Sequence, residues 1–193
     1  MENYVDDVFV LSELLTERYQ KQRVYLVDHC WGSIIGVMAA VERPELFAAY
    51  FVIGEQINSA ENDNISYDLV MEGVRRAGDT RTLKKLEANR RPPYSVEEKW
   101  KYPFFFQKVW SRSPAGPGIG TYDSSLILKA KLHRLIDRNN LVRGLLIGVN
   151  YVYTRLADLS FERDVPRLDC PVFIVNGRYD RTTPSEIAAR WFD

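Results

Sequence analysis

The sequence predicts an α/β fold, a parallel sheet of about three strands interrupted by a long helical insertion. Short apolar runs without polar alternation occur at 24–27, 48–53 and 171–175, as expected for strands of a parallel sheet. One helical segment separates the first two runs, which is the order of a βαβ unit. The middle of the chain, 59–168, contains no such run and is predicted to be helical.

The elements of the N-terminal part follow from periodicity. Apolar residues of 5–19 recur at i, i+3 and i+4, which predicts an amphipathic helix. The run 24–27 predicts a strand covered on both faces. Residues 33–41 are apolar nearly all round and predict a buried helix, which ends before Pro44. A second buried strand, 48–53, ends at Gly54.

The remaining elements divide the chain into a core and an insertion. A third buried strand is predicted at 171–175, a turn at 177–180 and a helix at 184–192 with Thr183 as its cap. We therefore expect core at 1–58, an inserted helical region at 59–168 and core again at 169–193. The helices predicted after the second strand are 66–77, 81–89, 96–110, 127–136 and 141–155.

The composition argues against a protein that binds nucleic acids or membranes. Lys plus Arg and Asp plus Glu are both 26, so the formal net charge is zero and we expect no nucleic-acid or membrane partner. A local excess of basic residues between 75 and 101 fits a solvated helix face or a patch that binds a partner. The N-terminus lacks the pattern of a secretory signal, and the longest apolar stretch is too short to span a bilayer.

Cysteine usage predicts a reducing compartment. The chain has two cysteines, Cys30 and Cys170, and neither has the spacing of a metal ligand or of a disulfide scaffold. We therefore expect a cytoplasmic protein, and no metal or organic cofactor is implied.

One motif contains a candidate catalytic nucleophile. Residues 24–36, VYLVDHCWGSIIG, run from a strand through a tight turn into a helix, with Cys30 at the apex and Gly32 after it. A nucleophile between small residues at such a turn is the pattern of a nucleophile elbow. The helix N-terminus would favour a Cys30 thiolate. The alternative is that Cys30 is a small buried hydrophobic residue.

Longer stretches resemble the α/β-hydrolase family, and within it the proline-iminopeptidase-like branch with a helical cap. The stretch VYLVDHCWGSIIGVMAAVERPELFAAYFVIGEQIN resembles that branch's strand, elbow, helix and next strand, and CPVFIVNGRYDRTTPSEIAARWF resembles the strand that ends in the acid of the catalytic triad. The resemblance implies a truncated α/β-hydrolase fold with 59–168 as the cap. It also implies hydrolysis of an ester or amide of a small molecule or peptide. Cys30 would be the nucleophile in place of serine, Asp180 the acid, and the Trp31 backbone N–H an oxyanion donor.

The sequence departs from that pattern at several points. Asp28 replaces the first glycine of the elbow, where we expect it to crowd the turn and to raise the pKa of Cys30. The resemblance lacks the N-terminal strands with the oxyanion loop and the C-terminal histidine segment, and only His29 and His133 are candidates for the base. We therefore expect weak or no hydrolysis by this chain alone, and an inactive remnant or a binding module is the alternative. The missing neighbour strands also predict homo-oligomers through exposed sheet edges.

Overall fold

The computed structural model confirms the α/β class. It describes residues 1–88, 90–92, 94, 137, 139–140, 143–144, 147–148, 151–152, 156, 158–178, 180 and 182–193. The chain divides into two compact units, Met1–Ser66 with Asp158–Asp193, and Tyr67–Ala157. Within the described ranges, no helix is both long enough and apolar enough to cross a membrane.

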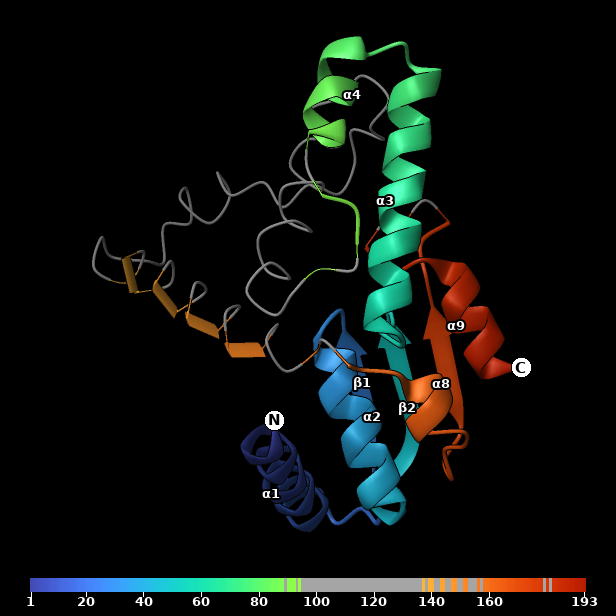
Figure 1. Cartoon of the computed structure of the whole chain (residues 1–193). Coiled ribbons are helices and arrows are strands. Elements are labelled where there is room, and N and C mark those ends of the chain that lie inside the picture. The colour runs from blue at the N-terminus through green and yellow to red at the C-terminus, as the bar shows by residue number, and fades with distance from the viewer. Residues whose placement is uncertain are drawn as a thin grey trace. The chain divides into compact units, whose positions relative to one another are not determined.

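The first unit holds the sheet and its helices (Figure 1). Its N-terminal elements, in chain order, are α1 (Glu2–Tyr19), β1 (Val24–His29), α2 (Gly32–Glu42), the 3-10 turn η1 (Pro44–Leu46) and β2 (Phe47–Ile53). After the second unit come the short helix α8 (Phe161–Asp164), the strand β3 (Val172–Val175) and the helix α9 (Ser185–Phe192). All three predicted strands are therefore present.

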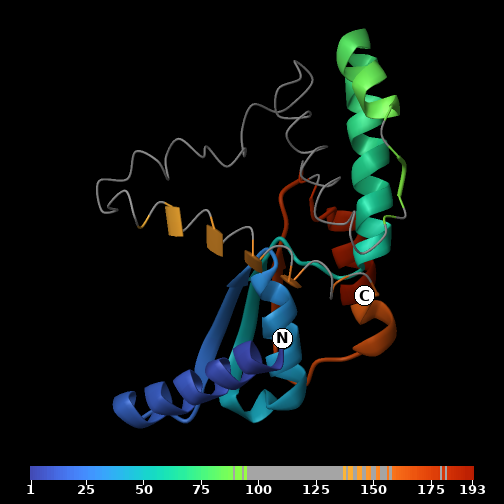
Figure 2. The same cartoon turned by 60° about the vertical axis from the view of Figure 1, so that its left-hand side comes forward.

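The three strands form one parallel sheet in the order β1-β2-β3. Tyr50 of β2 lies opposite Leu26 of β1 and Val172 of β3 in the register. The helix α2 contacts β1 and β2 and lies along one face of the sheet (Figure 2). Tyr50, fully buried, belongs to the core on this side, together with apolar side chains of α2.

The other face of the sheet is exposed, so the prediction that both faces of 24–27 are covered is wrong. Exposure alternates along β1 and β3, and Tyr25, Val27 and Phe173 are all exposed. The physical reason is that α2, the helix after β1, covers only one face. An apolar run without polar alternation shows that both faces are hydrophobic, but not that both are covered.

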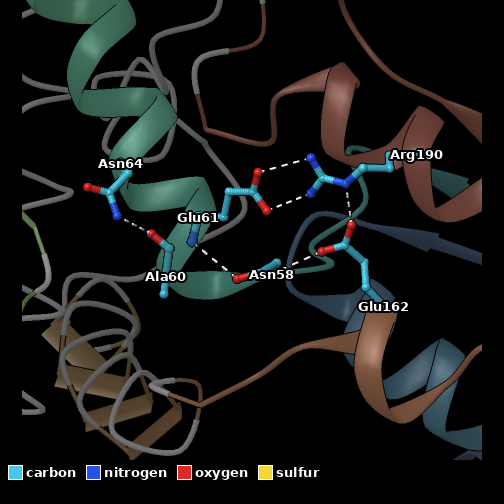
Figure 3. A network of polar contacts seen from close by, with 6 residues as sticks. All are labelled: Asn58, Ala60, Glu61, Asn64, Glu162 and Arg190. Carbon is cyan, nitrogen blue, oxygen red and sulfur yellow. Dashed lines mark hydrogen bonds and ion pairs between the residues drawn. The ribbon is translucent and has the colours of Figure 1, made fainter.

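A polar network joins three helices of the first unit (Figure 3). Arg190 of α9 donates hydrogen bonds to both carboxylate oxygens of Glu61 and, through Nε, to Glu162 Oε1 of α8 at 2.6 Å. Asn58 donates to Glu162 Oε2 at 3.2 Å and accepts the Glu61 backbone N–H at 3.1 Å. The network fixes the C-terminal helix to segments that are far away in the sequence.

The helix α3 (Ser59–Arg76) begins earlier than predicted. The side chain of Asn58 accepts the backbone N–H of Glu61, which supplies a partner for one of the free N–H groups of the first turn. Residues 59–64 are mostly polar, so their sequence lacks the apolar periodicity from which a helix is predicted.

In the second unit, α4 (Thr80–Glu87) agrees with the predicted helix 81–89. Asp79 caps it by accepting the Thr82 N–H at 3.0 Å. A small hydrophobic cluster joins the C-terminal part of α3 to α4; its buried members are Tyr67, Val70, Met71, Val74, Leu86 and Tyr94. The predicted helices 96–110 and 127–136, and most of 141–155, lie outside the described residues, as does His133.

Candidate functional site

Cys30 lies in the turn between β1 and α2, and its backbone has a φ of 56°. Few residues other than glycine have a positive φ, because their Cβ is crowded in this region. The turn is held in place from both sides: the Cys30 N–H donates to the Ile53 carbonyl of β2 at 2.9 Å, and the Cys30 carbonyl accepts the Ser33 N–H at 3.0 Å. Cys30 is thereby placed at the carboxyl edge of the sheet and at the N-terminus of α2.

Three influences act on the Cys30 thiol. Burial is the largest and raises its pKa, the Trp31 backbone N–H lowers the pKa by donating to the sulfur, and the negative charge of Asp180 raises it. The net result is a raised pKa, so the thiol carries its proton near neutral pH. A nucleophilic Cys30 would therefore need a base.

Asp180 lies in the loop after β3, and its charge acts on Cys30. Its Oδ1 accepts the Thr182 N–H at 2.7 Å and the Thr183 N–H at 3.0 Å. Its Oδ2 accepts the Thr183 hydroxyl at 2.7 Å. The prediction that Thr183 caps the last helix is wrong, because Pro184 occupies the N-cap position of α9 and the Thr183 hydroxyl is committed to Asp180.

Gly54 makes room for the Asp180 loop at the end of β2. Its φ is +68°, and a Cβ built on it would lie 3.2 Å from Thr183 Oγ1 and 3.8 Å from Asp180 Oδ2. The Gly54 N–H donates to the Val175 carbonyl of β3 at 3.0 Å. Cys30, Gly54 and Asp180 thus follow the carboxyl ends of three neighbouring parallel strands, the edge at which ligands bind in open α/β sheets.

Asp28 lies on the face of the sheet that α2 covers. A Cβ built on Gly36 of α2 would lie 1.8 Å from Asp28 Oδ2, so the carboxyl occupies the space that the glycine leaves empty. Burial raises the pKa of Asp28 to about 6. The carboxylate that raises the pKa of Cys30 is that of Asp180, whereas we expected Asp28 to do so. The missing Cβ of Gly36 explains how the turn accommodates Asp28 without a glycine at that position.

Glu55 is a buried carboxyl next to this turn that the sequence analysis missed. It follows Gly54, is 2% exposed, and receives hydrogen bonds from the hydroxyls of Ser33 and Tyr50. Burial raises its pKa to about 7, despite these hydrogen bonds, which lower it. Its position directly after a buried strand, at the same sheet edge as Cys30, is the signal by which it could have been found.

Backbone and side-chain hydrogen bonds surround Glu55. The single proton of the Tyr50 hydroxyl is shared between Glu55 Oε2, at 3.4 Å, and the Ser33 carbonyl, at 3.1 Å. The Gln56 N–H donates to Ser33 Oγ at 3.1 Å. The Glu55 N–H donates to Asn176 Oδ1, after β3, at 3.3 Å. Within the described ranges, Glu55 Oε1 and Asp28 Oδ2 are buried oxygens without a hydrogen-bond partner. Desolvated oxygens of this kind favour the protonated acid.

Of the remaining site candidates, Trp31 lies at Cys30 and the side chain of His29 lies apart from it. Trp31 is the N-cap residue of α2, with its side chain exposed and its N–H on the Cys30 sulfur. His29 ends β1 at an exposed position, and by the alternation of the strand it shares a face with Tyr25 and Val27. The structure thus brings together Cys30, Trp31 and Asp180.

Comparisons with known proteins give one distant sequence relative. No family model matches the chain. It is 20% identical to "Probable aminopeptidase YbaC" of Bacillus subtilis (strain 168) over 98% of its own length, and it spans about 60% of the length of that relative. A solved structure of MGS-M2, an α/β hydrolase from a deep-sea metagenome library, covers 94% of this chain and 56% of its own, at 12% identity and a TM-score of 0.41. The α/β class is established by the sheet and helices themselves.

Proposed function

We propose that this protein is a hydrolase of the α/β-hydrolase type, in which the turn between β1 and α2 is a nucleophile elbow and Cys30 the nucleophile. The observation that carries the proposal is the positive φ of Cys30 at a tight strand-to-helix turn. Such a turn exposes the side chain at its apex beside a helix N-terminus, where a developing negative charge is stabilised. Asp180, which acts on Cys30 electrostatically, is the proposed acid.

The proposed substrate is an ester or amide of a small molecule or a peptide. The relative's name, "Probable aminopeptidase", supports an amide bond next to an N-terminal residue. Attack would form a bond between Cys30 Sγ and the acyl carbon, and the leaving amine or alcohol would take up the thiol proton by way of a base. Water would then hydrolyse the thioester, releasing the acid and restoring the thiol. The Trp31 N–H is the proposed donor to the oxyanion.

The electrostatics of the site predict slow acylation. Burial and the Asp180 charge keep the Cys30 thiol protonated, so attack requires a base. His29 is exposed on the face that α2 does not cover, and His133 lies outside the described residues. In serine proteases, loss of one triad member leaves only about 10³–10⁴-fold catalysis over water. We therefore propose weak activity for this chain alone, in a reducing, cytoplasmic setting that keeps both cysteines as thiols.

Intact-mass spectrometry with the p-nitrophenyl ester of alanine tests the proposal. We expect the protein to gain the mass of one alanyl group, because the good p-nitrophenolate leaving group speeds acylation, whereas water still needs a base to hydrolyse the thioester. Cys30→Ala should remove the adduct, and the matched Cys170→Ala variant should keep it. Cys170 is the second free cysteine of the chain and is buried. Absence of the adduct from the wild-type protein, or its persistence in Cys30→Ala, would contradict the proposal.

The alternative function is that of an inactive remnant or a binding module. The raised pKa of Cys30 favours it, because a buried protonated thiol is a poor nucleophile. In that case the wild-type protein should remain unmodified in the same mass experiment, while far-UV circular dichroism shows it to be folded.

A further inference from the structure

The face of the sheet opposite α2 is hydrophobic and exposed to solvent. Its five most exposed hydrophobic side chains come from all three strands. They are Tyr25, exposed by 70%, Val27 by 62%, Ile53 by 47%, Phe173 by 49% and Val175 by 59%. We call these residues, with Phe51, the open face.

The strand register makes the open face continuous. Val27, Phe51 and Phe173 lie side by side across β1, β2 and β3. The Phe51 and Phe173 rings are stacked with their centroids 4.5 Å apart, and Tyr25 meets Phe51 edge to face at 6.2 Å. All three strands together thereby present a continuous surface of aromatic and β-branched side chains.

The open face carries no formal charge. The outward positions of the three strands hold Tyr25, Val27 and His29 in β1, Ala49, Phe51 and Ile53 in β2, and Phe173 and Val175 in β3, with neither Lys, Arg, Asp nor Glu among them. A surface of this kind can pack against an identical surface without burying an unpaired charge, which would be costly. Its complementarity to itself distinguishes it from a site for a charged partner.

We propose that a second copy of this chain covers the open face, with the two sheets packed face to face around a two-fold axis. Parallel sheets occur almost only with both faces covered, so leaving this face in water is unfavourable. The five exposed side chains present several hundred Å² of apolar surface. Two copies would therefore bury roughly 1,000 Å² in total, the lower limit for a specific interface, which predicts a reversible dimer of modest affinity.

A closed dimer through this face differs from association through strand edges. Edge pairing would add strands to β1 or β3 and could continue from copy to copy, whereas face-to-face packing stops at two. Ile53 belongs to β2, the central strand, and so it contributes to the open face but to neither edge. A charge at Ile53 therefore disrupts the proposed dimer and leaves edge pairing intact.

Sedimentation velocity over a wide range of protein concentration tests the dimer. We expect the wild-type protein to shift from monomer to dimer as concentration rises. In Val27→Lys and Ile53→Lys the midpoint should move to at least tenfold higher concentration, because each places a charge in the apolar interface. The matched control is Val41→Lys on α2, where Val41 is exposed by 47%, the same fraction as Ile53, but lies off the open face. This control should dimerise like the wild-type protein.

The sedimentation results distinguish a face-to-face dimer from a monomer and from association through strand edges. A wild-type protein that stays monomeric at all concentrations would overturn the proposal and leave the open face to another polypeptide. Open-ended assembly, or an Ile53→Lys variant that associates like the wild type, would overturn it in favour of strand edges. Far-UV circular dichroism of each variant establishes that it is folded, which we expect because the substituted side chains are exposed. The mass experiment on Cys30 is independent of these results, since it measures acylation and not assembly.

Discussion

The two faces of the sheet depart from the usual distribution of polar and apolar side chains in different ways. The face under α2 includes the carboxyl of Asp28, and the buried carboxyl of Glu55 lies at the end of β2 near it. The open face carries Tyr25, Val27 and Phe173, all exposed. Residue type alone would predict neither the buried carboxyls nor the exposed apolar side chains.

This difference shows that a sheet face can bury a carboxyl where the helix above it leaves space and where the carboxyl is protonated. Asp28 fits beneath α2 because Gly36 has no Cβ, and burial favours the neutral forms of both acids, with pKa values raised to about 6 and about 7. A neutral carboxyl costs far less to bury than a carboxylate. The open face has no helix to cover it within the described part of the first unit, so its side chains remain in water.

The largest expected effect on stability is that of Gly36→Ala, which would disrupt the packing between α2 and the sheet. The new Cβ would lie 1.8 Å from Asp28 Oδ2 and 2.8 Å from Tyr50 Cε2, and the Tyr50 ring is fully buried and cannot move away. We expect a loss of about 3 kcal/mol in the free energy of unfolding, measured by urea denaturation.

Gly32→Ala in the same helix is the matched control for Gly36→Ala. Its Cβ would lie 3.8 Å from Asp28 Oδ1, an ordinary contact, so we expect little change in stability. Adding Asp28→Ala to Gly36→Ala should restore part of the loss, since the shortest contact is with the Asp28 carboxyl. If Gly36→Ala proves as stable as the wild type, the carboxyl does not occupy this space.

The next effect is the part of the pH dependence of stability that belongs to Glu55, which Glu55→Gln should remove while the part that belongs to Asp28 remains. Folding raises the pKa of Glu55 from 4.5 to about 7, so folding favours its protonated form. The contribution to stability is complete below pH 4.5 and is lost as the pH rises towards 7. Above pH 7, Glu55→Gln should be more stable than the wild type by at most about 3 kcal/mol, and near pH 4 the two should be equal. Urea denaturation at several pH values measures this difference.

Glu42→Gln, which removes an exposed carboxylate at the end of α2, controls for the change in net charge. It should leave the pH dependence of the wild type intact. A Glu55→Gln variant whose stability stays parallel to that of the wild type from pH 4 to pH 8 would show that Glu55 does not titrate in this range.

The smallest expected effect is the difference in stability between two valine-to-alanine variants, one on each face of the sheet. Val52 is 0% exposed on the covered side and Val27 is 62% exposed on the open face. In dilute protein, where the proposed dimer is dissociated, Val52→Ala should cost about 2 kcal/mol and Val27→Ala less than about 0.5 kcal/mol. Urea denaturation measures both. Equal costs would mean that the same chain covers the open face in solution.

Local sequence signals located most elements of the first unit. The apolar runs at 24–27, 48–53 and 171–175 each correspond to a strand, and Pro44 begins the turn η1 that follows α2. Such signals depend on residues close together in the chain, as the conformational limits around proline do. The start of α3 was missed because Asn58 acts through its side chain and not through an apolar pattern.

The residues of the candidate site also differ in whether the sequence alone revealed them. Cys30 was named from the strand–turn–helix pattern around it and Asp180 from the family resemblance of 170–192, and their catalytic roles stay predictions. Glu55 was missed because its burial, and its hydrogen bond from Ser33 of α2, come from packing that only folding brings about. Thr183 was assigned to the wrong partner, since its hydroxyl could bond α9 or Asp180 and the loop geometry selects Asp180.

The sequence by itself determined the order of strands and helices and the turn in which Cys30 lies, because periodicity and glycine or proline positions act within a few residues. Only the tertiary structure decided which side of the sheet α2 covers and where the Asp28 carboxyl goes. Both depend on contacts between segments that are separate in the chain, such as the close approach of Gly36 to Asp28 and Tyr50. The pKa values of the buried acids follow from that packing, because burial is their largest cause.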